Sequence, residues 1–140
     1  DVELAQKLNF DGVHLGQEDI DCSIARRILG EKSIIGISCN DSLKLAQKAQ
    51  NCGANYLAFG PVFNSVTKKS DRKFVNLKNL KTIEKKISVP YTLIGGIKHE
   101  NITMLKNLNF KNLAVIDSLW NFKKGPVESA KLYSHILKKG

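Results

Sequence analysis

The sequence lacks a long apolar run, and it contains little cysteine and few aromatic side chains. None of its apolar runs approaches the roughly 20 residues that span a bilayer, and no secretory signal is visible, so we expect no membrane partner. Its three cysteines, Cys22, Cys39 and Cys52, are an odd number without C-x-x-C spacing. We therefore expect neither a disulfide framework nor a zinc site, and a reducing, cytoplasmic location.

The chain is strongly basic, but it lacks the alternation of aromatic and basic residues that single-strand nucleic-acid binders use. Its formal net charge is +9, and 19 of its 22 basic residues are lysines spread along the whole chain. Scattered lysines are typical of a solvated surface rather than of a binding stripe. We expect no nucleic-acid partner, and a tight affinity with steep salt dependence would contradict this expectation.

The sequence does contain a regular alternation of helical and strand-like segments. Its 140 residues, 42% of them hydrophobic, suffice for one α/β domain over residues 1–140. Short apolar runs predict strands at residues 12–15, 34–37, 56–59, 91–94 and 113–116. Between them, apolar residues at helical spacing predict helices, with Asp21 capping one and Asn40 or Asp41 the next. Further helices are predicted near residues 77–84, 102–108 and 126–138. Strict alternation predicts a parallel sheet with helices outside and all strand-end loops at one edge.

The most distinctive strand-end loop covers residues 60–69. Gly60 and Pro61 end an apolar strand, and the hydroxyls of Ser65 and Thr67 and two lysines follow. Hydroxyls, backbone amides and lysines together suit a phosphate or a diphosphate. A loop of this composition is also ordinary solvated surface. Its place at the carboxyl end of a parallel strand, where such folds bind ligands, favours the anion-binding interpretation.

Single residues near the other strand ends each have two interpretations. Asp19 suits Mg²⁺, which takes one or two carboxylates plus substrate phosphates, but a carboxylate at a helix start is also favoured by the helix dipole. Gly95 and Gly96 allow close approach to an anion, or simply a strand–helix turn. We interpret His14 as a hydrogen-bonded interior histidine rather than a catalytic base, and Cys39 as packing rather than a nucleophile.

Several of these segments resemble, in order and spacing, thiamine phosphate synthase (thiamine-phosphate pyrophosphorylase). The segments are Asp-Gly-Val-His-Leu-Gly-Gln-Glu-Asp at 11–19, Ile-Gly-Ile-Ser-Cys at 35–39, Phe-Gly-Pro-Val-Phe at 59–63, Thr-Lys-Lys at 67–69 and Ile-Gly-Gly-Ile at 94–97. The resemblance extends to about Trp120 and more loosely beyond it. It implies a (β/α)₈ TIM barrel, of which this chain supplies about five parallel βα units.

The resemblance also implies a reaction and a set of site residues. The family is a transferase of thiamine biosynthesis that joins hydroxymethylpyrimidine diphosphate to hydroxyethylthiazole phosphate by a dissociative mechanism and releases diphosphate. The implied roles are Mg²⁺ binding by Asp19, pyrimidine diphosphate binding by Ser38 and Lys68, and thiazole phosphate binding by Ser65, Thr67, Gly96, Ile116 and Asp117. No residue is implied as an acid or base.

The chain departs from the family pattern in two places. An Asn-Asp metal motif and a Gln-x-Arg-x-Lys strand, which precede the matching region in the family, are absent from these residues. We therefore expect the N-terminal part of the barrel to be missing, the chain alone to be inactive, and its open sheet edges to favour self-association. In addition, family members usually carry a small hydroxyl residue where Asp117 stands, and a carboxylate close to a phosphate is repulsive.

Two alternative functions stay open beside the synthase. One is a relative of the same fold, the thiazole tautomerase, which carries a histidine where this chain has Asn40. The other is a non-catalytic protein that binds only the thiazole phosphate. The retained Thr67 and Lys68 favour the synthase over the tautomerase.

Overall fold

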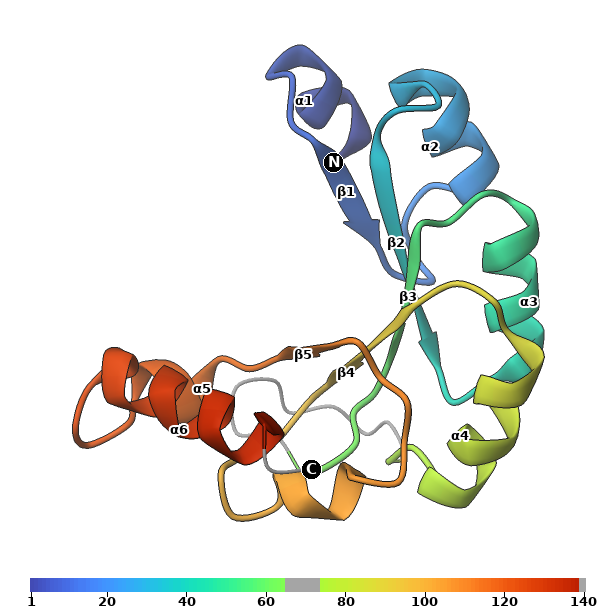
Figure 1. Ribbon diagram of the computed structural model, residues 1–140. Coiled ribbons are helices and arrows are strands. Elements are labelled where there is room, and N and C mark those ends of the chain that lie inside the picture. Colours follow the sequence, from blue (N-terminus) through green and yellow to red (C-terminus); the bar gives the residue numbers. More distant parts are fainter. Residues whose placement is uncertain (65–73, 139–140) are drawn as a thin grey trace.

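A computed structural model describes residues 1–64 and 74–138, which form one parallel sheet with helices between its strands (Figure 1). The strands are β1 (Gly12–Leu15), β2 (Ile34–Asn40), β3 (Tyr56–Phe59), β4 (Tyr91–Ile94) and β5 (Asn112–Ala114). They lie side by side in chain order, β1-β2-β3-β4-β5, and every neighbouring pair is parallel. The predicted α/β fold is confirmed as a partial TIM barrel of five βα units.

Most helices agree with the prediction, and two details differ. The helices are α1 (Val2–Lys7), α2 (Cys22–Leu29), α3 (Leu43–Asn51), α4 (Leu77–Ile83), α5 (Asp117–Trp120) and α6 (Pro126–Lys138), with short 3₁₀ turns η1 (Glu84–Lys86) and η2 (Ile102–Leu105). Asp21 caps α2 as predicted. The prediction that Asn40 or Asp41 caps α3 was wrong, because β2 continues to Asn40 and the hydroxyl of Ser42 accepts from the Leu45 amide. The helix predicted near 102–108 is only the 3₁₀ turn η2.

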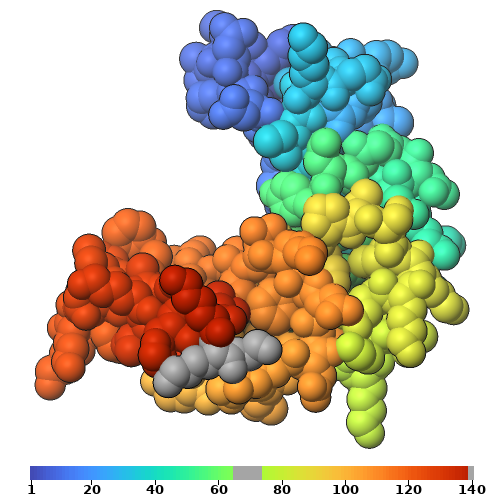
Figure 2. Space-filling model, viewed as in Figure 1, coloured from blue at the N-terminus to red at the C-terminus, as the bar shows by residue number. Residues whose placement is uncertain are grey.

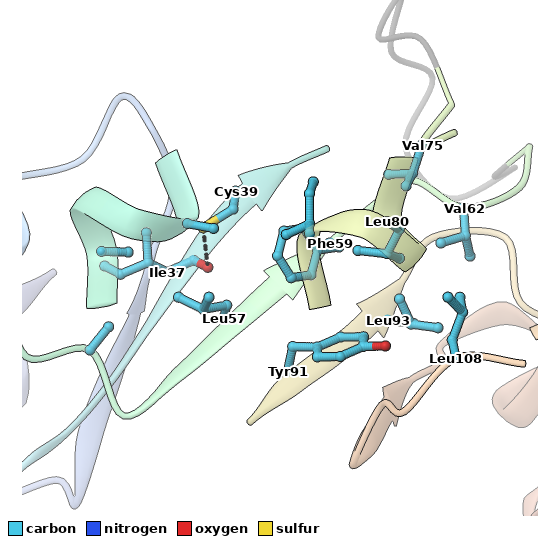
Figure 3. Packing of buried hydrophobic residues seen from close by; sticks show 14 of the residues in the cluster. Ile37, Cys39, Leu57, Phe59, Val62, Val75, Leu80, Tyr91, Leu93 and Leu108 are labelled. Atoms are coloured by element: carbon cyan, nitrogen blue, oxygen red, sulfur yellow. Dashed lines mark hydrogen bonds between the residues drawn. The ribbon is translucent and has the colours of Figure 1, made fainter. Parts of the chain in front are cut away.

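Alternate residues along each strand face opposite sides of the sheet, as the pleat requires. The outer side is apolar and is covered by α2, α3 and α4 (Figure 1). Its fully buried side chains include Ile35, Leu57, Phe59 and Leu93, none of which has measurable exposure. Figure 3 shows Phe59 beside Leu80 of α4, with the Tyr91 ring meeting Phe59 edge-on at a centroid distance of 5.5 Å. This outer layer is the hydrophobic core.

Within residues 1–64 and 74–138, no helix covers the inner side of the sheet. Figure 2 shows the molecule curving around an open hollow between its N-terminal and C-terminal parts. Most inward strand positions carry small or polar residues, with Ile34 and Ile94 as apolar exceptions, and the register aligns these positions in rows across the strands. One row is His14, Gly36 and Tyr56, and the next contains Ser38, Ala58 and Thr92. In the ranges 1–64 and 74–138, no helix is long and apolar enough to cross a membrane.

A disulfide bond joins Cys22, the first residue of α2, to Cys52, which follows α3. From the sequence we expected no disulfide framework, and this single bridge was not predicted. An odd cysteine count excludes complete pairing but not a single bridge. The two Cα atoms lie 6.1 Å apart, because α2 and α3 pack side by side on the outer face of β2 and bring residues 30 positions apart together. The remaining cysteine, Cys39, is free and buried.

Candidate functional site

A cavity of about 570 Å³ opens on the inner side of the sheet at the carboxyl ends of the strands. Parallel α/β folds place their ligand sites at this edge. Its lining comes from four parts of the chain: inward residues of β1, β3, β4 and β5, the segment after β3, the turn after β4, and the segment that joins β5 to α5. These include His14, Tyr56, Thr92, Gly96, Lys98, Ile116, Asp117 and Ser118. Of the strand-end loops predicted to converge, those after β4 and β5 meet at this cavity, through Gly95 and Gly96 and through Ile116 and Asp117.

The turn after β4 packs tightly against the segment after β3. Gly95 and Gly96 both adopt positive φ angles, +88° and +64°, which side chains rarely tolerate. A Cβ atom at Gly95 would lie 2.6 Å from the Pro61 Cα, and one at Gly96 would lie 2.6 Å from the Phe63 carbonyl carbon. The Gly60–Pro61 peptide bond is cis. The two glycines therefore let two backbone segments meet at the cavity wall, where Gly96 was predicted to lie.

Ile116 and Asp117 reach the same cavity from the start of α5. Ile116 is the N-cap residue and Asp117 the first residue of the helix, whose N-terminus has no side-chain cap. The Asp117 carboxylate instead accepts a hydrogen bond of 2.8 Å from the Asn121 side-chain amide. Asp117 thus places its charge beside the cavity, which is the arrangement in which it would repel a phosphate.

A buried polar cluster that the sequence analysis missed fixes the position of α5. The Ser118 hydroxyl donates to the Ile97 carbonyl oxygen at 2.7 Å and lies 2.6 Å from the Tyr133 hydroxyl. Ser129, which is fully buried, donates to the Ser118 carbonyl oxygen at 2.7 Å and lies 3.1 Å from His99. These bonds connect α5 and α6 to the turn after β4, so α6 fixes the position of the segments that form this wall of the cavity. Helical spacing alone does not show which faces of two distant helices will meet.

Inside the hollow, His14 bridges two hydroxyl groups. Its Nδ1 atom lies 2.9 Å from the Tyr56 hydroxyl oxygen and its Nε2 atom 2.9 Å from the Ser38 hydroxyl oxygen. Although its side chain is exposed, partial desolvation by the surrounding atoms lowers the pKa of His14 below its usual value, and nearby Asp19 partly offsets the shift. The prediction of a hydrogen-bonded histidine is confirmed, but its interior location was wrong, because His14 is exposed on the open face of the sheet.

Asp19 lies apart from the main cavity. Its carboxylate accepts a hydrogen bond of 2.6 Å from the Gly16 amide and borders a second cavity of about 120 Å³. Gln17 donates its side-chain amide to the Ser38 carbonyl oxygen, so this loop contacts β2. No group of three or more His, Cys, Asp or Glu side chains that could hold a metal occurs among the residues with described positions. One exposed carboxylate fits the sparse protein ligation typical of Mg²⁺, whose other ligands are water and phosphate oxygens.

The remaining predicted site residues have different outcomes. Ser65, Thr67 and Lys68 lie outside the described residues. Ser38 is half-buried and contacts His14, in the same row as Ala58 and Thr92, which line the cavity. Burial raises the pKa of the Cys39 thiol to about 12, and Figure 3 shows its bond to the Ile37 carbonyl oxygen, so its interpretation as a packing residue is confirmed.

Tyr56, Thr92 and Lys98 border the cavity but were not predicted to. Tyr56 and Thr92 occupy inward positions of their strands. Tyr56 lies two residues before the inward Ala58, and Thr92 is in register with Ala58. The two-residue alternation of side chains along a strand, applied to β3 and β4, would have predicted both residues. Lys98 lies beyond the glycine turn, and its position follows from that turn rather than from any period in the sequence.

Comparison with known proteins identifies the family. A family model described as thiamine monophosphate synthase matches residues 1–119. The chain is 47% identical to the thiamine-phosphate synthase of Pelagibacter ubique, over 91% of this chain and 61% of that protein. It is 39% identical to the thiamine-phosphate synthase of Prochlorococcus marinus (strain AS9601), over 94% of this chain and 36% of that protein. The chain therefore spans less than two thirds of the length of these curated relatives.

Solved structures agree. The thiamine phosphate pyrophosphorylase of Pyrococcus furiosus superposes with a TM-score of 0.80 at 32% sequence identity, covering 98% of this chain and 66% of that one. A 3-hexulose-6-phosphate synthase superposes with a TM-score of 0.67 at 16% identity, which shows a shared fold only. With matching motifs, a matching family model and a cavity at the expected edge of the sheet, the chain belongs to the thiamine monophosphate synthase family.

Proposed function

We propose that this chain serves thiamine biosynthesis as a transferase that joins hydroxymethylpyrimidine diphosphate to hydroxyethylthiazole phosphate and releases diphosphate. The observation that supports this most directly is the inner cavity, where Gly96, Ile116 and Asp117 lie together in a chain of this family. Both substrates are small, and 570 Å³ is within the range of small-molecule sites.

The proposed roles divide between the two substrates. Gly96 and the backbone of Ile116 and Asp117 would hold the thiazole phosphate, with Ser65 and Thr67 from the loop after β3. The glycine turn supports this assignment because backbone amides there can approach an anion closely. Ser38 and Lys68 would bind the diphosphate of the pyrimidine.

The proposed reaction is dissociative: the bond between the pyrimidine methylene carbon and the diphosphate oxygen breaks first, and the thiazole nitrogen then captures the cation. Such a step depends on neutralising the departing diphosphate. Here Lys68 would contribute a positive charge and Ser38 a hydrogen bond, while the thiazole phosphate contacts would orient the nucleophile. Asp19 would hold Mg²⁺, which when bound supplies further charge neutralisation at the diphosphate.

The decisive experiment assays product formation by the 140-residue chain, alone and joined to an N-terminal segment of a related synthase, at matched concentration. We expect coupling activity only in the joined form, because two substrates must be oriented together. Activity of neither form, with intact thiazole phosphate binding by calorimetry, would favour the non-catalytic alternative. Isomerisation of a thiazole phosphate without coupling would favour the tautomerase alternative.

In the active form, we expect Lys68→Ala to lower turnover by more than it weakens thiazole phosphate binding. The lysine is proposed to face the departing diphosphate, where charge is largest in the transition state. Steady-state kinetics and calorimetry on the same preparation compare the two losses, with Lys98→Ala as a control lysine that borders the cavity. Equal losses in turnover and binding would contradict this role.

We further propose that the 140-residue chain self-associates. The sheet ends at β1 and β5, and unpaired strand edges promote association. Sedimentation over a range of concentrations tests this, and a strict monomer would contradict it. A cytoplasmic location also remains a proposal. A Cys22–Cys52 pair that stays oxidised in freshly lysed cells would contradict it, because a reducing cytoplasm keeps such pairs as thiols.

A further inference from the structure

The inner face contains an unusual row of three residues on neighbouring strands. His14 on β1 is in register with Gly36 on β2, and Gly36 is in register with Tyr56 on β3. A Cβ atom at Gly36 would overlap the Tyr56 ring. The absence of a side chain at Gly36 therefore lets the tyrosine ring lie across β2 and reach β1, where its hydroxyl meets His14 Nδ1 at 2.9 Å.

This row connects to Ser38, the residue proposed to bind diphosphate. The second ring nitrogen of His14, Nε2, lies 2.9 Å from the Ser38 hydroxyl oxygen. Tyr56, His14 and Ser38 thus form a continuous chain of hydrogen bonds across three strands. His14 and Tyr56 both line the main cavity.

The direction of the hydrogen bonds among Tyr56, His14 and Ser38 decides whether the Ser38 hydroxyl can donate to a ligand. A neutral imidazole has one N–H donor and one acceptor nitrogen, so only two ordered arrangements exist. If Nδ1 carries the proton, it donates to Tyr56, and Ser38 uses its only proton to bond Nε2. An anion that approaches Ser38 then meets its lone pairs, which repel it.

In the other arrangement Tyr56 donates to Nδ1, and Nε2–H donates to the Ser38 oxygen. Ser38 then keeps its own O–H free to donate to a ligand. A phenol is a more acidic donor than an alkyl hydroxyl, and an imidazole nitrogen is a strong acceptor, so the Tyr56-to-Nδ1 bond favours this direction. Burial raises the pKa of Tyr56, which keeps the phenol protonated, and the lowered pKa of His14 keeps the imidazole neutral.

We propose that Tyr56 is a positioning residue that holds His14 in its Nε2–H tautomer, so that Ser38 presents its hydroxyl proton to a diphosphate-class anion. Gly36 is part of the same device, because it provides the space through which Tyr56 reaches His14. The inference rests on the proposed function for the ligand of Ser38. The proton order within the three residues can be measured without any ligand.

The first measurement is the tautomer of His14 in ¹⁵N-labelled chain, read from long-range ¹H–¹⁵N correlations of the ring. The chain has three histidines, and the signals lost in His14→Gln identify His14. We expect the Nε2–H pattern in the native chain and a mixture of tautomers in Tyr56→Phe, which keeps the ring but removes the hydroxyl. An Nδ1–H pattern in the native chain would overturn the proposal.

The second measurement is the affinity for inorganic diphosphate by calorimetry. We expect Ser38→Ala to weaken binding by about tenfold, near the lower end of the range for a lost hydrogen bond to a charged group. Tyr56→Phe should weaken it by about three- to tenfold, because a mixture of tautomers loses only part of that bond. Tyr91→Phe is the matched control, because it removes a tyrosine hydroxyl that bonds Glu84 on the helix-covered side of the sheet. We expect Tyr91→Phe to leave the affinity unchanged.

A second substitution that restores diphosphate binding would distinguish the proposed role of Tyr56 from a purely structural one. In the double variant His14→Gln with Tyr56→Phe, the glutamine amide nitrogen can donate to Ser38 without help from a tyrosine. We expect its affinity for diphosphate to exceed that of Tyr56→Phe alone, and an affinity no higher would contradict the role of the Nε2 proton. A native chain that binds no diphosphate would instead overturn the assignment of Ser38 and the proposed function, while the tautomer measurement would still decide the proton order.

Discussion

The two faces of the sheet are built from alternate residues of the same strands, yet they differ in almost every property. The outer face is apolar and mostly buried beneath α2, α3 and α4, with Ile35, Leu57 and Leu93 at zero exposure. The inner face has small or polar residues, such as Gly36, Ser38 and Thr92, and borders an open cavity. Two consecutive residues of a strand therefore lie in these two different environments.

The difference indicates a division of tasks between the faces. Burial of apolar side chains stabilises the fold by roughly 25 cal/mol per Å² removed from water, and the outer face contains most of that burial. The inner face contributes less apolar burial and instead offers hydrogen-bonding groups to a ligand. Substitutions on neighbouring residues should therefore separate stability from binding, and the predictions below test that separation.

The largest effect should come from a matched pair on β4. Leu93 faces the core and is fully buried, while its neighbour Ile94 lines the cavity and is half-buried. We expect Leu93→Ala to lower the free energy of unfolding by about 2–5 kcal/mol, through lost burial and a new cavity in the core. Ile94→Ala should cost clearly less, because its side chain already meets open space. Urea unfolding followed by circular dichroism measures both losses, and equal losses would contradict a stabilising role confined to the outer face.

The disulfide lies on the outer side of the sheet and should affect stability alone. Reduction of the Cys22–Cys52 bond opens a loop of about 30 residues, and we expect it to lower the free energy of unfolding by about 2–4 kcal/mol. The same reductant should not change the stability of the double variant Cys22→Ser with Cys52→Ser. The tautomer pattern of His14 should be the same before and after reduction. A changed pattern would show that the two faces are coupled.

The fold could be predicted from the sequence because its signals are local and repeated. Gly30 after α2 and Pro126 at the start of α6 mark helix ends through backbone preferences that act within a few residues. Five short apolar runs between helices leave few topologies other than a parallel sheet. The family motifs then placed Gly96 and Asp117 at one site, and both line the same cavity.

The features that were missed depend on contacts between distant segments. Ser42 caps α3 because β2 extends to Asn40, and strand length is decided by pairing with β3 rather than by the sequence near residue 40. The Cys22–Cys52 bond depends on how two helices pack. The reach of Tyr56 to His14 depends on the strand register and on the missing side chain of Gly36. Residue types alone carry none of this information.

Gly36→Ala should be an exception to the separation between the faces, because here a substitution at an inward position should lower stability. The added methyl group would overlap the Tyr56 ring, so the ring must move and the bond to His14 is lost. We expect a loss of about 1–3 kcal/mol in the free energy of unfolding, typical of overpacking, together with a mixed tautomer pattern of His14. In a Tyr56→Ala background the same substitution should cost little, since the clash is gone. A double-mutant cycle measures this, and additive costs would contradict the steric explanation.

The smallest effect concerns binding and should leave stability almost unchanged. Asp117 lines the cavity, and its carboxylate accepts a hydrogen bond from the Asn121 side-chain amide at 2.8 Å. Its charge lies on the same wall as Gly96, where the thiazole phosphate is proposed to bind, and like charges at short range repel. Asp117→Ser should therefore tighten the binding of hydroxyethylthiazole phosphate, by up to about fivefold because solvent screens a half-exposed charge. Asn121→Ala breaks the same hydrogen bond but keeps the charge, so it should not tighten binding. If calorimetry finds weaker binding in Asp117→Ser, the carboxylate serves mainly to orient α5 rather than to face the phosphate.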